Sequence, residues 1–261
     1  MKLPSLIGMV HLLALPGSPG FAGDMSAVLS AARNDAALLV EAGFPALMVE
    51  NFGDSPFFAD QVPPVTVAGM ALAVDAVVRA GAVPVGVNVL RNDAMAALAV
   101  AAVSGANFIR VNILTGTMFT DQGMISGMAA EVARERARLG SSVLVLSDVF
   151  VKHAQPPPGL TIDQAALDTW ERGGADALIV SGTGTGTEPD LDHASLLRAT
   201  VPGATILVGS GTRPDNLARL AEVTDGAIVG SWVKREGKAH NPVDSGRARE
   251  LVTAAKAAGW L

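Results

Sequence analysis

One junction recurs along this chain and limits the folds that it can form. At each copy a helix-like segment ends in Ala-Gly or Gly-Ala, and an apolar, strand-like run follows. The four copies lie at Glu41–Glu50, Ala80–Asn88, Ser104–Asn112 and Gly173–Val180. Glycine at such a junction can end a helix in the left-handed conformation. Repetition of one helix–strand unit indicates alternating β and α elements around a parallel sheet.

The hydrophobic pattern predicts eight strands, each followed by a helix, in a single domain over residues 1–261. The chain has 261 residues, and a (β/α)8 TIM barrel typically has about 250. A doubly wound open sheet is the weaker alternative, because no Gly-x-Gly-x-x-Gly pattern follows the first strand. We therefore expect an α/β fold, a TIM barrel. The expected strands are Leu6–His11, Ala46–Glu50, Pro84–Val89, Phe108–Ile113, Val143–Asp148, Ala177–Val180, Ala204–Val208 and Ala227–Val229.

The composition argues against several classes of protein. The net charge is −6 and no basic run occurs, which disfavours a general nucleic-acid surface. The absence of cysteine excludes a disulfide framework and a thiolate metal site. No apolar run reaches membrane-spanning length without Gly, Pro or charge, and the first residues do not form a signal peptide. We expect a cytoplasmic protein without membrane insertion or nucleic-acid binding.

Three short apolar runs between Asp176 and Lys234 end in small residues that expose the backbone. Ser181–Gly186 follows the first run, Gly209–Gly211 the second, and Gly230–Trp232 the third. Backbone N–H groups at a strand-to-helix turn suit a phosphate, and glycine lets them approach it closely.

The loops after strands seven and eight form the usual phosphate site of such barrels. The sequence thus predicts a phosphate site after these strands; the alternative is that the glycines only close tight turns. Lys234 and Arg235 could add positive charge to the pocket. The expected phosphate-binding residues are Ser181, Gly182, Thr183, Gly184, Gly209, Ser210, Gly211, Gly230 and Ser231.

Polar side chains stand at the ends of five expected strands, on the barrel face that carries the chemistry in this fold. Converging polar groups are costly to desolvate without partners. A ligand site therefore explains the group better than a hydrogen-bonded plug, which stays the alternative for any single residue. The group comprises His11, Glu50, Asn51, Asn88, Arg110, Asn112 and Asp148, followed by Lys152 and His153.

Five of these residues are candidate catalytic groups: Glu50, Asp148, Lys152, His153 and His11. Glu50 and Asp148 could act as acid and base, or they could hold a divalent cation such as Mg²⁺ together with a histidine. Lys152 could lose its proton and form a Schiff base, or bind a phosphate as a cation. His11 could act as a base or only bond to a neighbouring strand. No other cofactor is implied.

Four further polar residues are expected to bind substrate: Asn51, Asn88, Arg110 and Asn112. Arg110 could bind a carboxylate or phosphate of the substrate, because guanidinium groups bind both in a bidentate way. It could equally pair with one of the two acidic residues at the strand ends.

Several longer strings together resemble the BtpA/SgcQ family over nearly the whole chain. Phe150 is one departure, since a histidine is expected there. If that histidine served a metal or a proton relay, this chain lacks it. The matching strings are Gly8–Leu12, Leu15–Pro19, Val49–Phe57, Gly86–Asp93, Ile109–Gly123, Asp148–Ala154, Ser181–Gly186, Val208–Gly211 and Asp225–Lys234.

The resemblance implies a phosphate-binding TIM barrel and leaves the reaction open. One family name comes from the accumulation of photosystem I in cyanobacteria. The other comes from a member of a sugar-related bacterial gene cluster that is sometimes labelled a nucleosidase. We expect an enzyme that acts on a sugar phosphate or a phosphoribosyl compound, as an isomerase, a lyase or a nucleosidase-like hydrolase.

Two alternatives remain: a non-enzymatic assembly or stability factor of the photosystem I biogenesis type, and a phosphate-sensing binding protein. An assembly factor would need an exposed apolar surface. The aromatic candidates are Phe52, Phe57, Phe58, Trp232 and Trp260. We expect these side chains to pack over the barrel mouth or in a homo-oligomer interface.

Overall fold

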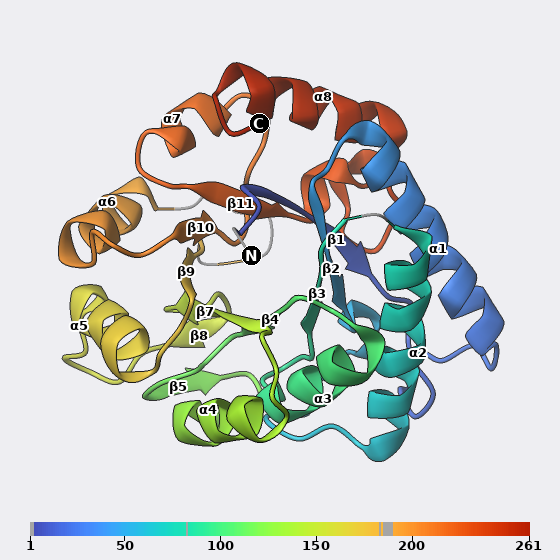
Figure 1. The fold of residues 1–261 in the computed structure, drawn as a ribbon, viewed down its shortest axis with the longest axis horizontal. Helices are drawn as coiled ribbons and strands as arrows, with labels where there is room; N and C mark the ends of the chain where they lie inside the picture. Colours follow the sequence, from blue (N-terminus) through green and yellow to red (C-terminus); the bar gives the residue numbers. More distant parts are fainter. Residues whose placement is uncertain (1–2, 82, 183, 185–189) are drawn as a thin grey trace.

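The computed structural model describes residues 3–81, 83–182, 184 and 190–261. Eight parallel strands close into a barrel in the order β1-β11-β10-β9-β7-β4-β3-β2, which confirms the predicted fold (Figure 1). The strands are β1 (Leu6–His11), β2 (Ala46–Glu50), β3 (Val85–Asn88), β4 (Phe108–Val111), β7 (Leu144–Val149), β9 (Ala177–Val180), β10 (Ile206–Val208) and β11 (Gly226–Val229).

Helices surround the barrel, and the junction glycines end them in two ways. Gly43 and Gly105 have φ angles of 103° and 78° and end their helices in the left-handed conformation. Gly81 is extended instead, with a φ of −117°, and its N–H caps the helix on Val77 O. The helices are α1 (Met25–Ala42), α2 (Pro64–Ala80), α3 (Ala94–Ser104), α4 (Ala129–Arg138), α5 (Ile162–Leu167), α6 (Leu191–Thr200), α7 (Leu217–Ala221) and α8 (Ser245–Ala257).

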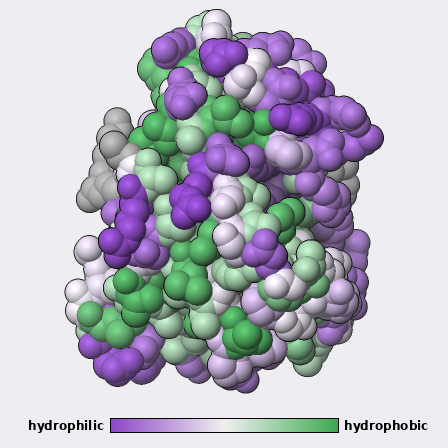
Figure 2. All heavy atoms as spheres, turned by 90° about the vertical axis from the view of Figure 1, so that its right-hand side faces the viewer, coloured by the Kyte–Doolittle hydropathy of each residue, from purple (hydrophilic) through white to green (hydrophobic). Residues whose placement is uncertain are grey.

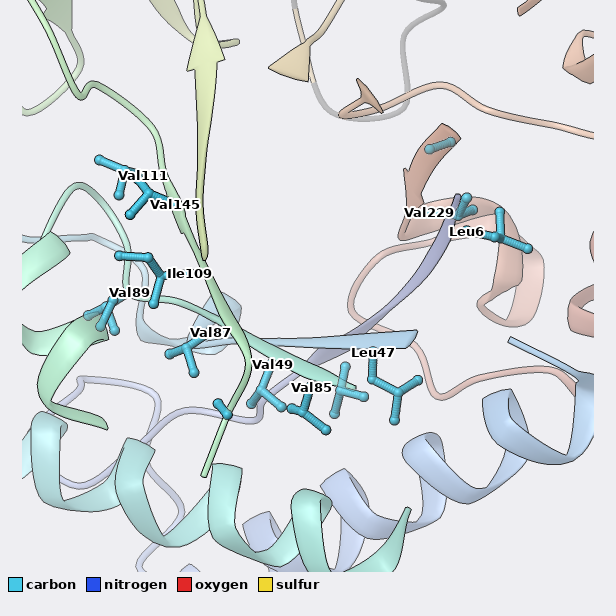
Figure 3. Packing of buried hydrophobic residues seen from close by; sticks show 14 of the residues in the cluster. Leu6, Leu47, Val49, Val85, Val87, Val89, Ile109, Val111, Val145 and Val229 are labelled. Atoms are coloured by element: carbon cyan, nitrogen blue, oxygen red, sulfur yellow. The ribbon is translucent and has the colours of Figure 1, made fainter. Parts of the chain in front are cut away.

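The core has an outer and an inner layer, because alternate residues of each strand point to opposite faces. Leu47, Val49 and Val85 belong to the outer layer and lie between the strands and the helices (Figure 3). The inner layer fills the barrel and includes Phe108, whose ring passes over Gly86. A Cβ atom on Gly86 would lie 2.0 Å from Phe108 Cε2, so this strand position requires glycine.

A small antiparallel sheet adjoins the barrel in addition to the eight predicted strands. It consists of β5 (Thr117–Thr120), β6 (Gly123–Ser126) and the short β8 (Ala154–Gln155), in the order β6-β5-β8. Gly123, with a φ of 102°, lies at the hairpin turn. The pairing of β5 with β8 fixes the segment that follows β7, and this segment contains Lys152.

The α1–α2 side of the surface mixes hydrophilic and hydrophobic side chains (Figure 2). Large apolar side chains exposed on the molecule include Leu13, Phe58, Val65 and Leu72. Assembly of this chain into a homo-oligomer, expected from the sequence, stays a prediction. Within the described ranges, none of the helices combines the length and the apolar character needed to cross a membrane.

Candidate functional site

A cavity of about 280 Å³ lies at the C-terminal ends of the barrel strands. It adjoins a second cavity of about 610 Å³, and both are lined by Glu50, Phe52, Arg110 and Lys152. The first cavity is also lined by His11 and by the loops after β10 and β11. The structure therefore brings many of the predicted site residues together in one region.

The buried side chains of His11 and Glu50 face each other in the site. His11 Nδ1 lies 3.0 Å from Ala239 O, so this nitrogen carries the proton and donates it to the carbonyl. Burial, followed by the charge of Lys234, lowers the pKa of His11 well below its usual value, and the ring is neutral. Its Nε2 then offers a lone pair 3.6 Å from Glu50 Oε1. Burial raises the pKa of Glu50, which favours the protonated acid opposite this acceptor.

The ring of His11 is held in place from two sides. Phe52, in the short 3₁₀ helix η1 (Phe52–Asp54), stacks on it with 4.4 Å between ring centroids. A Cβ atom on Gly230 would lie 3.0 Å from His11 Cε1, so glycine at this position leaves room for the imidazole. The histidine is thus oriented toward Glu50 by packing as well as by its hydrogen bond.

Asp148 is engaged by other site residues. Arg110 donates to both of its carboxylate oxygens, from Nε at 2.8 Å and from Nη2 at 2.7 Å. Asn112 donates at 3.2 Å and the Ser181 hydroxyl at 3.4 Å. The predicted acid therefore lies in the site, but its oxygens fix Arg110, and this geometry suits positioning better than proton transfer.

Lys152 lies in a turn whose backbone is constrained at several points. Phe150 and His153 have φ angles of 55° and 57°, in the left-handed region that non-glycine residues seldom adopt. The buried Arg91 donates from Nη2 to Lys152 O at 2.5 Å. Burial, followed by the charge of Arg110, lowers the pKa of Lys152 to about 8. His153 is exposed and lines the second cavity.

The predicted substrate-binding asparagines lie at different depths. Asn51 receives a hydrogen bond from Leu90 N at 2.7 Å and donates to Asp54 at 3.1 Å, so it ties two loops together. Asn88 donates to Arg110 O and to Asn112 Oδ1 beneath the site. Of these amides, Asn112 lines the second cavity.

The loops after β10 and β11 line the first cavity as the phosphate hypothesis requires. Gly209, Ser210, Gly211, Gly230 and Ser231 all border it. Among the residues that the structure describes, the buried hydroxyls of Ser210 and of the adjoining Thr212 have no hydrogen-bond partner.

The loop after β9 is placed differently. Gly182 borders another cavity, of about 760 Å³. Ser181 borders it too and bonds to Asp148. Gly184 belongs to the described residues but borders none of these cavities. Thr183 lies outside the described residues.

Several residues of the cavity were missed by the sequence reasoning. Thr212, Arg213 and Arg247 line the first cavity together with the loops after β10 and β11; these loops and the three residues are called the phosphate end. Arg247 comes from α8, and its guanidinium lies 4.0 Å from the Trp232 ring centroid. Thr212 directly follows the predicted glycine loop Gly209–Gly211, and this position is the sequence signal for it. Nothing in the local sequence marks Arg247, because only the closed barrel brings it to this loop.

Lys234 does not line the first cavity as the sequence suggested, although its charge acts on His11. Its side chain is fully buried, and Nζ lies 2.5 Å from Asp35 Oδ2 on α1. Lys234 follows the 3₁₀ helix η3 (Ser231–Val233), which comes directly after β11 and Gly230. Arg235 likewise does not line the phosphate-end cavity.

The predicted Mg²⁺ ligands do not form a recognisable cation site. Across residues 3–81, 83–182, 184 and 190–261, no three acidic or histidine side chains cluster as metal ligands would. Asp148 is committed to Arg110, and Glu50 faces His11. The cation stays a prediction.

Comparison with known proteins confirms the resemblance. The BtpA family profile matches residues 2–257. An uncharacterized protein of Thermococcus kodakarensis is 50% identical over 253 residues, covering 96% of this chain and 95% of its own. The photosystem I biogenesis protein BtpA of Synechocystis is 44% identical over 249 residues, covering 95% of this chain and 87% of its own.

Solved structures share the fold at low sequence identity. Phosphoribosyl anthranilate isomerase from Thermus thermophilus has a TM-score of 0.60 and 15% identity, with 97% of this chain and 98% of that chain covered. The N-acetylmannosamine-6-phosphate 2-epimerase from Clostridium perfringens has a TM-score of 0.54 and 13% identity, with 98% and 93% covered.

Proposed function

This chain belongs to the BtpA family, and we propose that it is an enzyme acting on a small phosphorylated compound of the sugar phosphate or phosphoribosyl type. The observation that carries the proposal is the pair of unpartnered hydroxyls of Ser210 and Thr212 at one end of the cavity. A buried hydroxyl without a partner is costly. A phosphate, with several acceptor oxygens, would satisfy both donors at once.

The surroundings of these hydroxyls suit an anion. Arg213 and Arg247 border the same end of the cavity and supply positive charge. The glycines at 209, 211 and 230 leave the backbone accessible, and the loops follow the last two barrel strands. Phosphate commonly binds at this place in (β/α)8 barrels.

Two other residues of the cavity lining supply proton transfer. Protonated Glu50 is the acid. His11 Nε2 can accept a proton from the Glu50 carboxyl group, which leaves Glu50 as a charged carboxylate. Such a pair could serve isomerisation, lysis or glycosidic cleavage, all of which need a proton moved next to the bond that changes. Arg110, fixed by Asp148, would orient a polar group of the substrate between the two cavities. The fold neighbours named for phosphoribosyl and sugar phosphate compounds agree with this substrate class.

A thermal-shift screen tests the proposal. Inorganic phosphate, sugar phosphates, nucleotides and nucleosides are each added with Mg²⁺ or with EDTA. A ligand at about a hundred times its Kd stabilises the protein by roughly 2.7 kcal/mol, on the order of 5–10 °C for a chain of this size. We expect a phosphorylated compound to give such a shift. A shift that also requires Mg²⁺ would restore the cation hypothesis.

An assembly factor is the second candidate, because one 44%-identical relative is named a photosystem I biogenesis protein. This function predicts a protein partner and no response to phosphorylated compounds. If no compound of the panel raises the melting temperature, the enzyme proposal is withdrawn in favour of this one. A binding protein that senses phosphate would respond in the screen but turn over none of the compounds.

A further inference from the structure

We propose that Lys152 is a covalent catalytic residue whose amine attacks the carbonyl carbon of a phosphorylated aldehyde or ketone. The inference rests on the proposed function, because the phosphate would anchor the carbonyl compound. It narrows the substrate class from phosphorylated compounds in general to those with a free or ring-opened carbonyl group. It also narrows the reaction to aldol-type cleavage or to isomerisation through an imine.

The position of Lys152 is the first argument. Its side chain borders the phosphate-end cavity, the adjoining cavity of about 610 Å³ and the third cavity of about 760 Å³. A substrate held by its phosphate near Ser210 and Thr212 would extend past this amine. Glu50 borders the first two of these cavities as well, so the amine and a proton donor face the same space.

The charges around Lys152 are the second argument. Arg110 is engaged in the two hydrogen bonds to Asp148, and Arg91 binds the main-chain carbonyl of Lys152 itself. In the part of the chain that the structure describes, Lys152 Nζ makes no hydrogen bond or ion pair, although the negative charges of Glu50 and Asp148 act on it. The side chain is half-buried, so the ammonium form loses part of its hydration without gaining a direct partner.

The backbone on either side of Lys152 is the third argument. The left-handed residues Phe150 and His153 flank it, and β8 fixes the following residues on β5. Arg91 holds its carbonyl oxygen. Strained backbone that is held from several sides is typical of functional positions, where a reactive group must keep one orientation.

The protonation state agrees with this geometry. Burial and the Arg110 charge lower the pKa of Lys152 from 10.5 to about 8. At neutral pH about a tenth of the side chain is then the free amine, whereas an ordinary lysine has roughly a thousandth or less. The free amine is the form that attacks a carbonyl.

The chemistry balances without an oxidant or a reductant. The nitrogen lone pair forms a C–N bond as the carbonyl π bond breaks, and a proton passes from the nitrogen to the oxygen to give a carbinolamine. Glu50 then donates a proton to the leaving hydroxyl, and water departs to leave a protonated imine and the Glu50 carboxylate. The imine accepts the electron pair released when a neighbouring C–C or C–H bond breaks, and the Glu50 carboxylate takes the proton from that carbon or from the hydroxyl of the departing carbonyl fragment. Glu50 returns the proton to the enamine carbon, and addition of water to the imine gives the product and the free lysine.

Borohydride trapping tests the inference. The protein is incubated with dihydroxyacetone phosphate, glyceraldehyde 3-phosphate or ribose 5-phosphate and then reduced with sodium borohydride. Peptide mass spectrometry locates the adduct among the five lysines of the chain: Lys2, Lys152, Lys234, Lys238 and Lys256. At neutral pH we expect labelling of Lys152 to exceed that of the exposed Lys256 by roughly tenfold or more, given the larger free-amine fraction.

Variants separate covalent chemistry from simple charge. Lys152→Arg and Lys152→Met should both lose the adduct, whereas the matched surface variant Lys256→Arg should keep it. The rate of trapping should rise with pH around a midpoint of about 8. Dihydroxyacetone, which lacks the phosphate, should label Lys152 at least tenfold more slowly.

Two results would overturn the inference. One is the absence of an adduct on Lys152 with all three probes. The other is turnover of one of these probes by Lys152→Arg when Lys152→Met does not turn it over. Melting temperatures measured with the same probes show which proposal has failed. A probe that raises the melting temperature without labelling Lys152 removes only the covalent step. The absence of both responses removes the proposed function as well.

Discussion

Individual hydroxyls at the phosphate end give a prediction in which stability and binding change in opposite directions. We expect Ser210→Ala and Thr212→Val to leave the melting temperature unchanged or raised, because each removes a buried hydroxyl without a partner. Each variant should weaken phosphate binding about tenfold, which corresponds to roughly 1.4 kcal/mol. Melting curves and phosphate titrations measure the two effects.

A matched control for these substitutions is Ser195→Ala. The hydroxyl of Ser195 is exposed on α6, bonds to Leu191 O and does not line the phosphate-end cavity. The control variant should leave phosphate binding unchanged. Wild-type affinity in Ser210→Ala and Thr212→Val would contradict the assignment of the phosphate end.

Glu50 provides a pH-dependent prediction. Burial raises the pKa of its carboxyl in the folded protein, so the folded state binds this proton more tightly than the unfolded chain. Stability therefore falls as the pH rises through the window between the unfolded and folded pKa values. We expect Glu50→Gln to lose turnover and to be more stable than wild type above this window. The gain should be on the order of 1 kcal/mol for each pH unit that separates the two pKa values.

Melting temperatures of both proteins from about pH 4 to pH 8 measure this effect. The difference between variant and wild type should grow toward the higher pH. A constant difference across the range would show that Glu50 has the same pKa in both states. Phosphate binding by the variant serves as the control for an intact cavity.

At the scale of single residues, the sequence predicted which polar side chains reach the barrel mouth but not how they pair. Their positions at strand ends predict that Asp148 and Arg110 lie on the same face of the barrel. The positions do not predict that Arg110 binds both carboxylate oxygens of Asp148. That contact depends on the register of β4 and β7, in which Arg110 pairs with Leu146 and Val111 with Ser147. The sequence also placed Asn51 at the barrel mouth. It did not predict that the side-chain amide of Asn51 accepts a hydrogen bond from Leu90 N and so joins two loops.

At the scale of elements, a buried ion pair joins α1 to the segment after β11. Lys234 Nζ binds Asp35, which also accepts a hydrogen bond from Val243 N at 2.8 Å. Removing one partner leaves an uncompensated buried charge. We expect Asp35→Leu to lower the free energy of unfolding by about 3–5 kcal/mol, measured by urea denaturation.

The double variant Asp35→Leu with Lys234→Met is the control for this prediction. It removes both charges, so it should recover most of the stability lost by the single variant. If the double variant is no more stable than Asp35→Leu, the packing of α1, and not the unpaired charge, accounts for the loss.

Among the elements, the repeating helix–strand units were predictable and the β5–β6 hairpin was not. The barrel strands are buried on both faces, so each is a continuous apolar run that can be recognised in the sequence. The hairpin strands are short and mostly exposed, and Phe119 and Met124 face outward. β5 also pairs with β8, which lies about 30 residues later in the chain, and no local pattern predicts that contact.

At the scale of the whole molecule, the two ends of the chain complete the barrel together. β1 pairs with β11, and α1 packs against α8. Deleting residues 245–261 removes buried Leu251 and Val252 and exposes this seam. We expect the truncated protein to lose its cooperative thermal transition, as followed by near-ultraviolet circular dichroism.

A substitution on the exposed face of α8 controls for this deletion. Thr253→Ala changes α8 without disturbing the buried residues and should melt cooperatively, within a few degrees of wild type. A sharp transition in the truncated protein would mean that the barrel closes without α8. The closed sheet was predictable from the eightfold pattern, whereas the contribution of Arg247 to the cavity required this closure.

The division of the cavity between two parts of the chain has a consequence for how its specificity could be changed. The phosphate end comes from residues 209–213, 230, 231 and 247. Glu50 lies at the end of β2, and Lys152 lies in the segment after β7. Phe57, Leu90 and Gln122 line the second cavity, next to Glu50 and Lys152, and do not line the first. A library confined to these three positions would vary the part of the substrate that is accepted while its anchor and its reactive groups stay intact, which makes the molecule a starting scaffold for selecting new substrates.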